Sequence, residues 1–165
     1  MSNSDNVTIK KIGSKDFITL TRQIIGLPVS RTWRGYGTAI FFELGKLSEH
    51  RKRRDGSISL WGEVTIDLEI GWRVERKQSI YFGSSSGHWR INNCLDKLQG
   101  LKIVNITLQG RLPELIVELS NGIWLHSFST WEGQPDWTLF FNNYSPNRQW
   151  LFSKRGNIIL ATSND

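Results

Sequence analysis

Four short strand-like runs follow one another between residues 98 and 141, and this stretch constrains the fold more than any other part of the chain. The runs cover residues 102–108, 114–119, 123–128 and 136–141. Turn-forming residues separate them: Gly110 and Pro113, then Asn121 and Gly122, then Gly133 and Pro135. Short apolar runs between such turns are typical of antiparallel β structure.

The longest alternating pattern lies in residues 57–74. Val64, Ile66, Leu68, Ile70 and Trp72 fall on one face, and Glu63, Thr65, Asp67, Glu69 and Gly71 fall on the other. One polar face predicts an antiparallel sheet with one side toward solvent. We expect Gly62 and Gly71 to mark bulges or bends in it.

Two segments change to a helical period. In residues 15–25 the apolar side chains form one helical face. The alternation of residues 18–21 is also compatible with a strand, which is the alternative for this segment. In residues 89–98, Ile91, Leu95 and Leu98 share a face and Gly100 ends the segment. The sequence therefore predicts a single α+β domain over residues 1–165, predominantly antiparallel β, with about eight to ten strands and these two short helices.

The two halves of the chain resemble each other. Residues 14–83 and 89–141 each read as a helix, a glycine, and a strand pair ending in Glu-Leu, at Glu43-Leu44 and Glu118-Leu119. We expect an internal structural duplication that forms a sandwich or a barrel-like pair of sheets. The alternative is that any β-rich chain aligns with itself in this way.

Composition narrows the class of protein. The net charge is +6, and much of the excess lies in one run, His50 to Arg54, for which we predict a solvated loop. The single cysteine, Cys94, excludes an internal disulfide and a cysteine-based zinc site. No apolar run approaches the roughly 20 residues that span a bilayer, and no signal peptide is recognisable. We expect a cytoplasmic protein with no membrane partner.

Candidate site residues are few. Glu63, Asp67 and Glu69 share a strand face, where residues two apart lie roughly 7 Å from each other, but solvated strand faces show the same pattern. Of the eight tryptophans, Trp33, Trp61 and Trp131 have polar or glycine-rich surroundings and are expected to be exposed. No catalytic, metal-binding or phosphate-binding motif is present, so no cofactor is expected. The partner-binding candidates are Arg51, Lys52, Arg53, Arg54, Glu63, Asp67, Glu69, Trp33, Trp61 and Trp131.

The chain resembles a family of small, uncharacterised bacterial β-rich proteins. The resemblance rests on Gly26-Leu27-Pro28-Val29 with Arg31, on residues 62–73, on Phe82-Gly83-Ser84, on residues 119–122 and on residues 136–140. Some proteins of this general type resemble immunity proteins, which bind and block a bacterial toxin. The resemblance implies no established activity and no catalytic residues.

Three functions remain open at this point. We favour a non-enzymatic protein-binding module, immunity-like, with another protein as its partner. The second hypothesis is a nucleic-acid-binding module that uses the basic loop and exposed aromatic side chains. The third is a hydrolase with a strand-borne carboxylate pair, which would need a closed, dry pocket holding two carboxylates.

Overall fold

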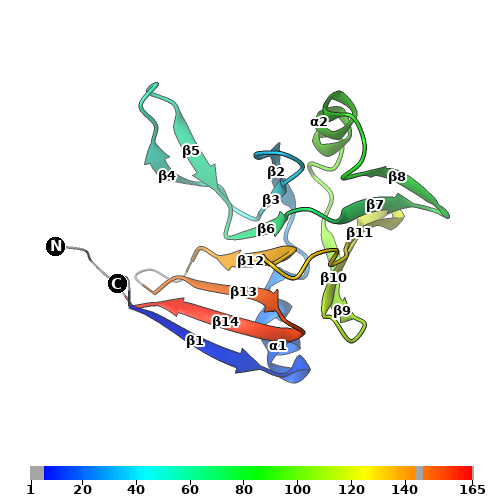
Figure 1. Cartoon of the computed structure of the whole chain (residues 1–165). Coiled ribbons are helices and arrows are strands. Elements are labelled where there is room, and N and C mark those ends of the chain that lie inside the picture. The colour runs from blue at the N-terminus through cyan, green and yellow to red at the C-terminus, as the bar shows by residue number, and fades with distance from the viewer. Residues whose placement is uncertain (1–5, 144–146, 165) are drawn as a thin grey trace.

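The computed structural model describes residues 6–143 and 147–164, which form three antiparallel sheets and two α-helices (Figure 1). The large sheet has the order β1 (Val7–Ile12), β14 (Asn157–Ser163), β13 (Gln149–Lys154), β12 (Trp137–Phe141), β6 (Val64–Leu68), β3 (Ile40–Leu44), β2 (Val29–Arg34). The small sheet has the order β8 (Ser79–Gly83), β7 (Trp72–Arg76), β11 (Ile123–Ser127), β10 (Glu114–Leu119), β9 (Ile103–Gln109). A separate hairpin pairs β4 (Ser48–Lys52) with β5 (Ile58–Trp61).

The α+β class with mostly antiparallel strands is confirmed, but the predicted number of strands is wrong. The described residues form fourteen strands, not eight to ten, and the sheets do not close into a barrel there. Residues 57–74 account for part of the difference, because they contribute to β5, β6 and β7, which lie in three different sheets. The basic run predicted as a loop is β4 and the turn that follows it.

The chain changes sheet at Gly62 and Gly71, where the sequence predicted bends. A Cβ atom at Gly62 would lie 2.4 Å from the backbone oxygen of Leu44, and one at Gly71 would lie 2.2 Å from that of Phe128. Neither backbone contact leaves room for a side chain. The two glycines therefore allow consecutive strands to separate into different sheets.

The two helices form where the apolar period predicted them. The first is α1 (Ser14–Thr21), extended by the 3₁₀ turn η1 (Arg22–Ile24), and the second is α2 (His88–Asp96). From α1, Phe17 packs edge-on against Trp137 of β12, with ring centroids 6.1 Å apart. The main core lies on this side of the large sheet and includes Ile66, Leu139 and Phe141 together with Val117 and Leu125 of the small sheet.

The order of the strands in the two halves corresponds. After α1 come β2, β3 and β6, paired in that order, and after α2 come β9, β10 and β11, also paired in order. The next two strands of each half cross to the other sheet: β7 and β8 continue from β11, while β12 and β13 continue from β6.

Hydrogen bonds correspond as well. Gly26 N donates to Ile103 O at 2.8 Å, and Gly100 N donates to Val29 O at the same distance. The indole N–H of Trp72 donates to Thr38 O at 2.9 Å, and that of Trp137 donates to Pro113 O at 2.7 Å. The internal duplication stays a prediction, which this pattern supports.

The halves differ in two connections. The β4–β5 hairpin stands between β3 and β6, where the second half has only the turn η2 (Ser120–Gly122) between β10 and β11. Residues 128–136 stand between β11 and β12, where the first half has only residues 69–71 between β6 and β7.

Candidate functional site: the outer face of the large sheet and the basic hairpin

The large sheet carries aromatic side chains on the side opposite α1, which we call the outer face. Residues directly opposite each other in an antiparallel pair point to the same side, and the register places Phe41 opposite Trp33 and Phe140 opposite Trp150. Five half-buried aromatic residues share this side, and none belongs to the main core: Trp33, Phe41, Phe140, Trp150 and Phe152. The outer face is therefore a second apolar layer, and in Figure 1 α1 lies behind the sheet that bears it.

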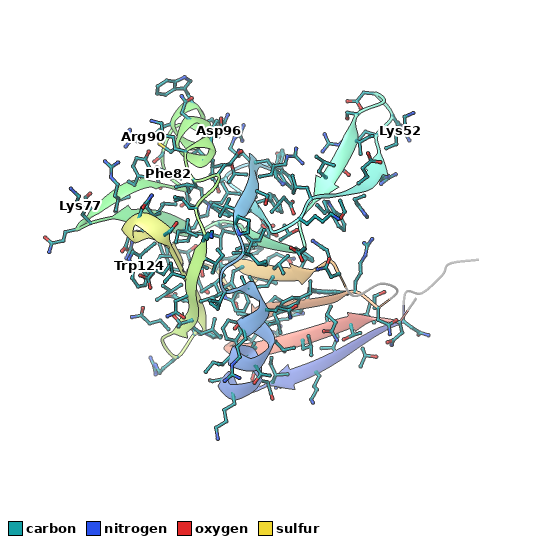
Figure 2. All side chains as sticks on the ribbon, turned by 180° about the vertical axis from the view of Figure 1, so that it is seen from behind. Lys52, Lys77, Phe82, Arg90, Asp96 and Trp124 are labelled. Carbon is teal, nitrogen blue, oxygen red and sulfur yellow. The ribbon has the colours of Figure 1, made fainter. Side chains whose placement is uncertain are left out.

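The β4–β5 hairpin, which we call the basic hairpin, projects from one end of this sheet (Figure 1). All of β4 is exposed, and Lys52 lies out on the hairpin, away from the body of the molecule (Figure 2). Its four consecutive cations are Arg51, Lys52, Arg53 and Arg54. Among the described residues none of them forms an ion pair, since the one such pair found there joins Arg73 and Glu75 at 2.6 Å. Their charge is available to a partner.

The turn of the basic hairpin is held by its own polar groups. Arg53 N donates to Ser57 O at 2.7 Å. The Oδ1 atom of Asp55 accepts hydrogen bonds from the Ser57 backbone N–H at 2.9 Å and from the Ser57 hydroxyl at 2.6 Å. These bonds lower the pKa of Asp55. The local bonds fix the tip without a core beneath it, which a two-stranded hairpin otherwise needs.

An aromatic and cationic cluster joins the hairpin to the outer face. The His50 ring stacks on Trp61 with centroids 3.3 Å apart, and the Arg148 guanidinium lies 4.9 Å from the Trp61 centroid. Arg148 Nη2 is also 3.5 Å from His50 Nδ1. Burial, then the charges of Arg148 and Arg51, lower the pKa of His50. The cationic form of His50 is therefore disfavoured, and its flat ring covers one face of Trp61.

Glu43 fixes the base of the hairpin from within the sheet. Its side chain is fully buried and accepts three hydrogen bonds, from Trp33 Nε1 at 3.0 Å, Gly62 N at 2.9 Å and the Thr65 hydroxyl at 2.6 Å. Asn142 Nδ2 donates to Gly62 O and Thr65 Oγ1. These bonds orient Trp33 of the outer face and the point where the hairpin leaves the sheet.

Two neighbouring hollows lie over this region. One, of about 400 Å³, is lined by the hairpin cations together with Arg31, Trp33 and Trp61. The other, of about 200 Å³, is lined by Trp33, Trp61, Phe41 and Phe140. Because they share Trp33 and Trp61, they are neighbours, the first basic at the hairpin and the second aromatic at the sheet.

The carboxylates named from the sequence do not share one solvated face, because Asp67 is buried. Glu63 braces the hairpin base, where its Oε2 atom accepts from Lys46 N at 2.8 Å. Asp67 is only 6% exposed, and its Oδ1 atom has no hydrogen-bond partner among the described residues. Burial, then the charge and hydrogen bond of Glu69, raise the pKa of Asp67 to about 8. The prediction that this polar face is exposed to solvent is wrong at β6. Phe41 and Thr138 lie on either side of Asp67 on the same face of the sheet and cover it.

The structure brings most of the other sequence candidates together. Arg51 to Arg54, Trp33 and Trp61 line one hollow, whereas Trp131 lies in the separate 128–136 connection. Sequence reasoning missed Phe140, Trp150 and Phe152, although aromatic residues two apart in a strand are the signal for a common face. It also missed Trp89, which is 79% exposed on α2.

Comparisons of this chain with protein families, with curated proteins and with solved structures returned no match. No group of three or more metal-binding side chains occurs in residues 6–143 and 147–164. Within the same residues, no helix is long and apolar enough to cross a membrane. The geometry of the outer face and the hairpin therefore carries the functional argument.

Proposed function

We propose that this protein is a non-enzymatic protein-binding module whose interface is the outer face of the large sheet together with the basic hairpin. The partner is a protein with an apolar patch bordered by acidic side chains. The observation that carries the proposal is the row of half-buried aromatic residues outside the main core, directly beside four cations that lack ion pairs in the described part of the chain.

The composition of this surface supports a protein partner. Protein interfaces are enriched in tryptophan, phenylalanine and arginine at their energetic centres, and a polar rim surrounds them. Trp33 and Phe41 stack with centroids 3.8 Å apart and planes 5° from parallel. Their paired rings already have fixed orientations, so little side-chain entropy is lost when a partner covers them.

The position of the hairpin supports a role in recognition. It stands where the second half of the chain has only a short turn, so the scaffold does not require it. Its cations would speed the encounter with an acidic partner and select against basic ones. An immunity-like protein of this kind would block an acidic surface of its toxin, because a basic surface cannot mimic nucleic acid.

Single-stranded nucleic acid is the second candidate, and one observation favours it. Trp61, His50 and Arg148 place aromatic rings beside cations, as stacking platforms for bases do. However, His50 already covers Trp61 and Phe41 already covers Trp33, so in each pair one ring face is unavailable to a base. We therefore rank the protein partner first.

The test is capture from a lysate of the source cells, treated with nuclease, by four forms of the immobilised protein. One variant replaces Arg51, Lys52, Arg53 and Arg54 with serine, and a second carries Phe140→Ser and Phe152→Ser. A matched control removes the same charge at exposed lysines elsewhere: Lys10, Lys15, Lys97 and Lys102. We expect one acidic protein on the native chain and the control, and neither test variant should retain it. Equal capture by all four forms would contradict the proposal.

A parallel titration with a fluorescent oligothymidylate separates the two candidates. A nucleic-acid module should bind it tightly at low salt, lose affinity steeply as salt rises, and weaken when Trp61 becomes alanine. The protein-binding account predicts only weak binding that Trp61→Ala leaves unchanged.

A further inference from the structure

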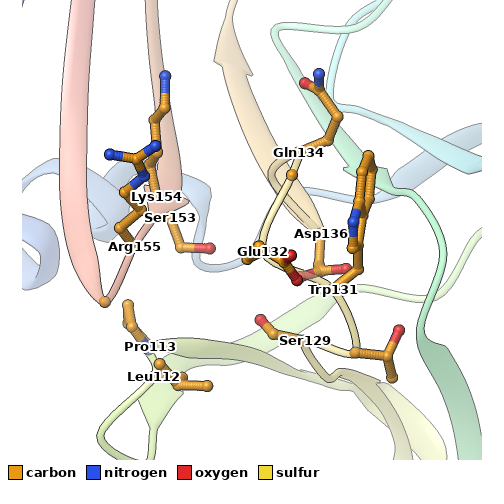
Figure 3. Close-up of a pocket in the computed structure, with 13 residues that line it drawn as sticks. Leu112, Pro113, Ser129, Trp131, Glu132, Gln134, Asp136, Ser153, Lys154 and Arg155 are labelled. Carbon is orange, nitrogen blue, oxygen red and sulfur yellow. The ribbon is translucent and has the colours of Figure 1, made fainter.

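A separate cavity of about 320 Å³ opens where the 128–136 connection meets two turns (Figure 3). Leu112 and Pro113 come from the β9–β10 turn, and Ser153, Lys154 and Arg155 come from the end of β13 and its turn. Ligand pockets measure roughly 300–1,000 Å³, so this cavity suits a molecule of about the size of one sugar ring.

Buried polar groups face this cavity. Asp136 is 3% exposed and Ser153 is 8% exposed, yet both line it, and the Ser129 side chain points in from the opposite side (Figure 3). The backbone holds these groups in place: Glu69 N donates to Asp136 O at 2.9 Å, and Ser129 N donates to Glu114 Oε1 at 3.0 Å. Burial and the charge of Glu114 raise the pKa of Asp136, while a hydrogen bond from Ser129 opposes them. The cavity therefore offers the carboxyl group of Asp136 and the hydroxyls of Ser129 and Ser153 at fixed positions, and Thr130 and the carboxyl group of Glu132 line it as well (Figure 3).

Trp131 forms a flat wall of the same cavity. A Cβ atom on Gly133 would lie 2.1 Å from the Trp131 ring, so the glycine backbone packs directly against the indole. This contact fixes the ring although Trp131 is 51% exposed. A flat, fixed indole beside hydrogen-bonding groups is suited to the apolar face of a ring that also carries hydroxyls.

Two cations complete the rim. Lys154 and Arg155 are exposed and follow Ser153 along one side of the cavity (Figure 3). Neither belongs to an ion pair within the described ranges. A ligand that extends from the cavity to these two cations would bind more tightly if it carried a negative group there.

We propose that this cavity binds a single sugar ring that carries an anionic substituent, either a carboxylate or a phosphate. The ring lies against Trp131, its hydroxyls bond to Asp136, Ser129 and Ser153, and the anion faces Lys154 and Arg155. This cavity shares no lining residue with the hollow at the basic hairpin, and the ligand proposed for it does not require the protein partner proposed above.

The test is saturation-transfer NMR and calorimetry on the full chain with six probes: glucuronate, galacturonate, glucose 6-phosphate, mannose 6-phosphate, glucose and inorganic phosphate. We expect at least one anionic sugar to bind, with glucose and phosphate each weaker by about tenfold or more, since each lacks one set of contacts. Trp131→Ala and Asp136→Asn should each reduce binding by about tenfold. Trp89→Ala, which removes an exposed indole elsewhere, should leave it unchanged.

Three results would overturn the proposal. The first is no saturable binding of any anionic sugar, provided that the native chain is folded by circular dichroism. The second is phosphate binding as tightly as the sugar phosphates, which would mean an ion site only. The third is anionic-sugar binding that survives Trp131→Ala and Asp136→Asn. None of these results depends on whether the outer face binds a protein.

Discussion

The indole N–H of Trp33 donates to Oε1 of Glu43 at 3.0 Å, which ties an aromatic residue of the outer face to a fully buried carboxyl group. The other oxygen of Glu43 accepts from Gly62 N and from the Thr65 hydroxyl, at the point where the hairpin leaves the sheet. One side chain therefore sets the position of both parts of the proposed interface.

Glu43→Ala should destabilise the protein and loosen the base of the hairpin. It leaves the donors of Trp33 and Gly62 without their acceptor, and each buried unsatisfied group costs about 1–3 kcal/mol. We expect a loss of about 3 kcal/mol in the free energy of unfolding, measured by urea titration. Glu118→Ala, at the matching position of β10 where the side chain is half-buried, is the control and should lose less than about 1 kcal/mol. If both variants lost the same free energy of unfolding, the hydrogen bonds of Glu43 would contribute no more to stability than the half-buried Glu118 does.

Asp67 should make the protein less stable as pH rises. Its pKa is raised to about 8 in the folded state from an ordinary 3.8, so the folded state holds the proton more tightly than the unfolded chain. The stability that protonated Asp67 contributes to the folded state is fully present below about pH 4 and is lost as the pH rises toward 8.

Asp67→Asn keeps a neutral group at every pH and removes this dependence. Urea titrations measure the free energy of unfolding at pH 5 and at pH 8. Between these pH values the native chain should lose about 3 kcal/mol more of it than Asp67→Asn does. If the difference between the two proteins is the same at both pH values, Asp67 does not titrate in this range.

Gly62→Ala and Gly71→Ala should each disrupt the fold. The new Cβ atoms would lie 2.4 Å and 2.2 Å from backbone oxygens, which cannot move as the end of a side chain can. We expect each to cost about 3 kcal/mol or more, read from the thermal midpoint. Gly87→Ala has nothing within 4 Å of its Cβ and should cost less than about 1 kcal/mol. A mild effect at Gly62 would mean that the hairpin base can rearrange.

Arg148→Gln should raise the pKa of His50. The Arg148 charge is the second cause, after burial, of the lowered pKa of that imidazole, and the Arg51 charge is the third. The ring proton shifts of His50 across a pH titration by NMR measure the change. Arg155→Gln removes a charge from a different surface and should leave the His50 titration where it was. If Arg148→Gln left the pKa of His50 unchanged, Arg148 would not lie close to His50 at Trp61 as described.

The period of the apolar residues predicted much of the fold. Residues 15–25 and 89–98 overlap the two helices, each of which begins one residue earlier, and the chain changes sheet at Gly62 and Gly71. The separation of residues 57–74 into three sheets could not be predicted, because strand alternation is the same whichever sheet a strand joins. The predicted number of strands was too low partly for this reason, and partly because the basic run predicted as a loop contains β4.

The candidate site was only partly predictable. The basic run and Trp33 and Trp61 were found as unusual residues, and the structure places them around one hollow. The burial of Asp67 was missed because it depends on Phe41 and Thr138, which neighbouring strands bring beside it from far along the chain. Local pattern does not contain that information.

Site-specific photo-cross-linking in the source cells tests the central proposal most directly. A photoreactive phenylalanine analogue would replace Phe152 on the outer face, Arg54 on the hairpin or, as a control, exposed Lys102 at the start of the small sheet. The account predicts the same cross-linked acidic protein from positions 152 and 54 and none from position 102. Cross-links to nucleic acid, or the same products from all three positions, would contradict it.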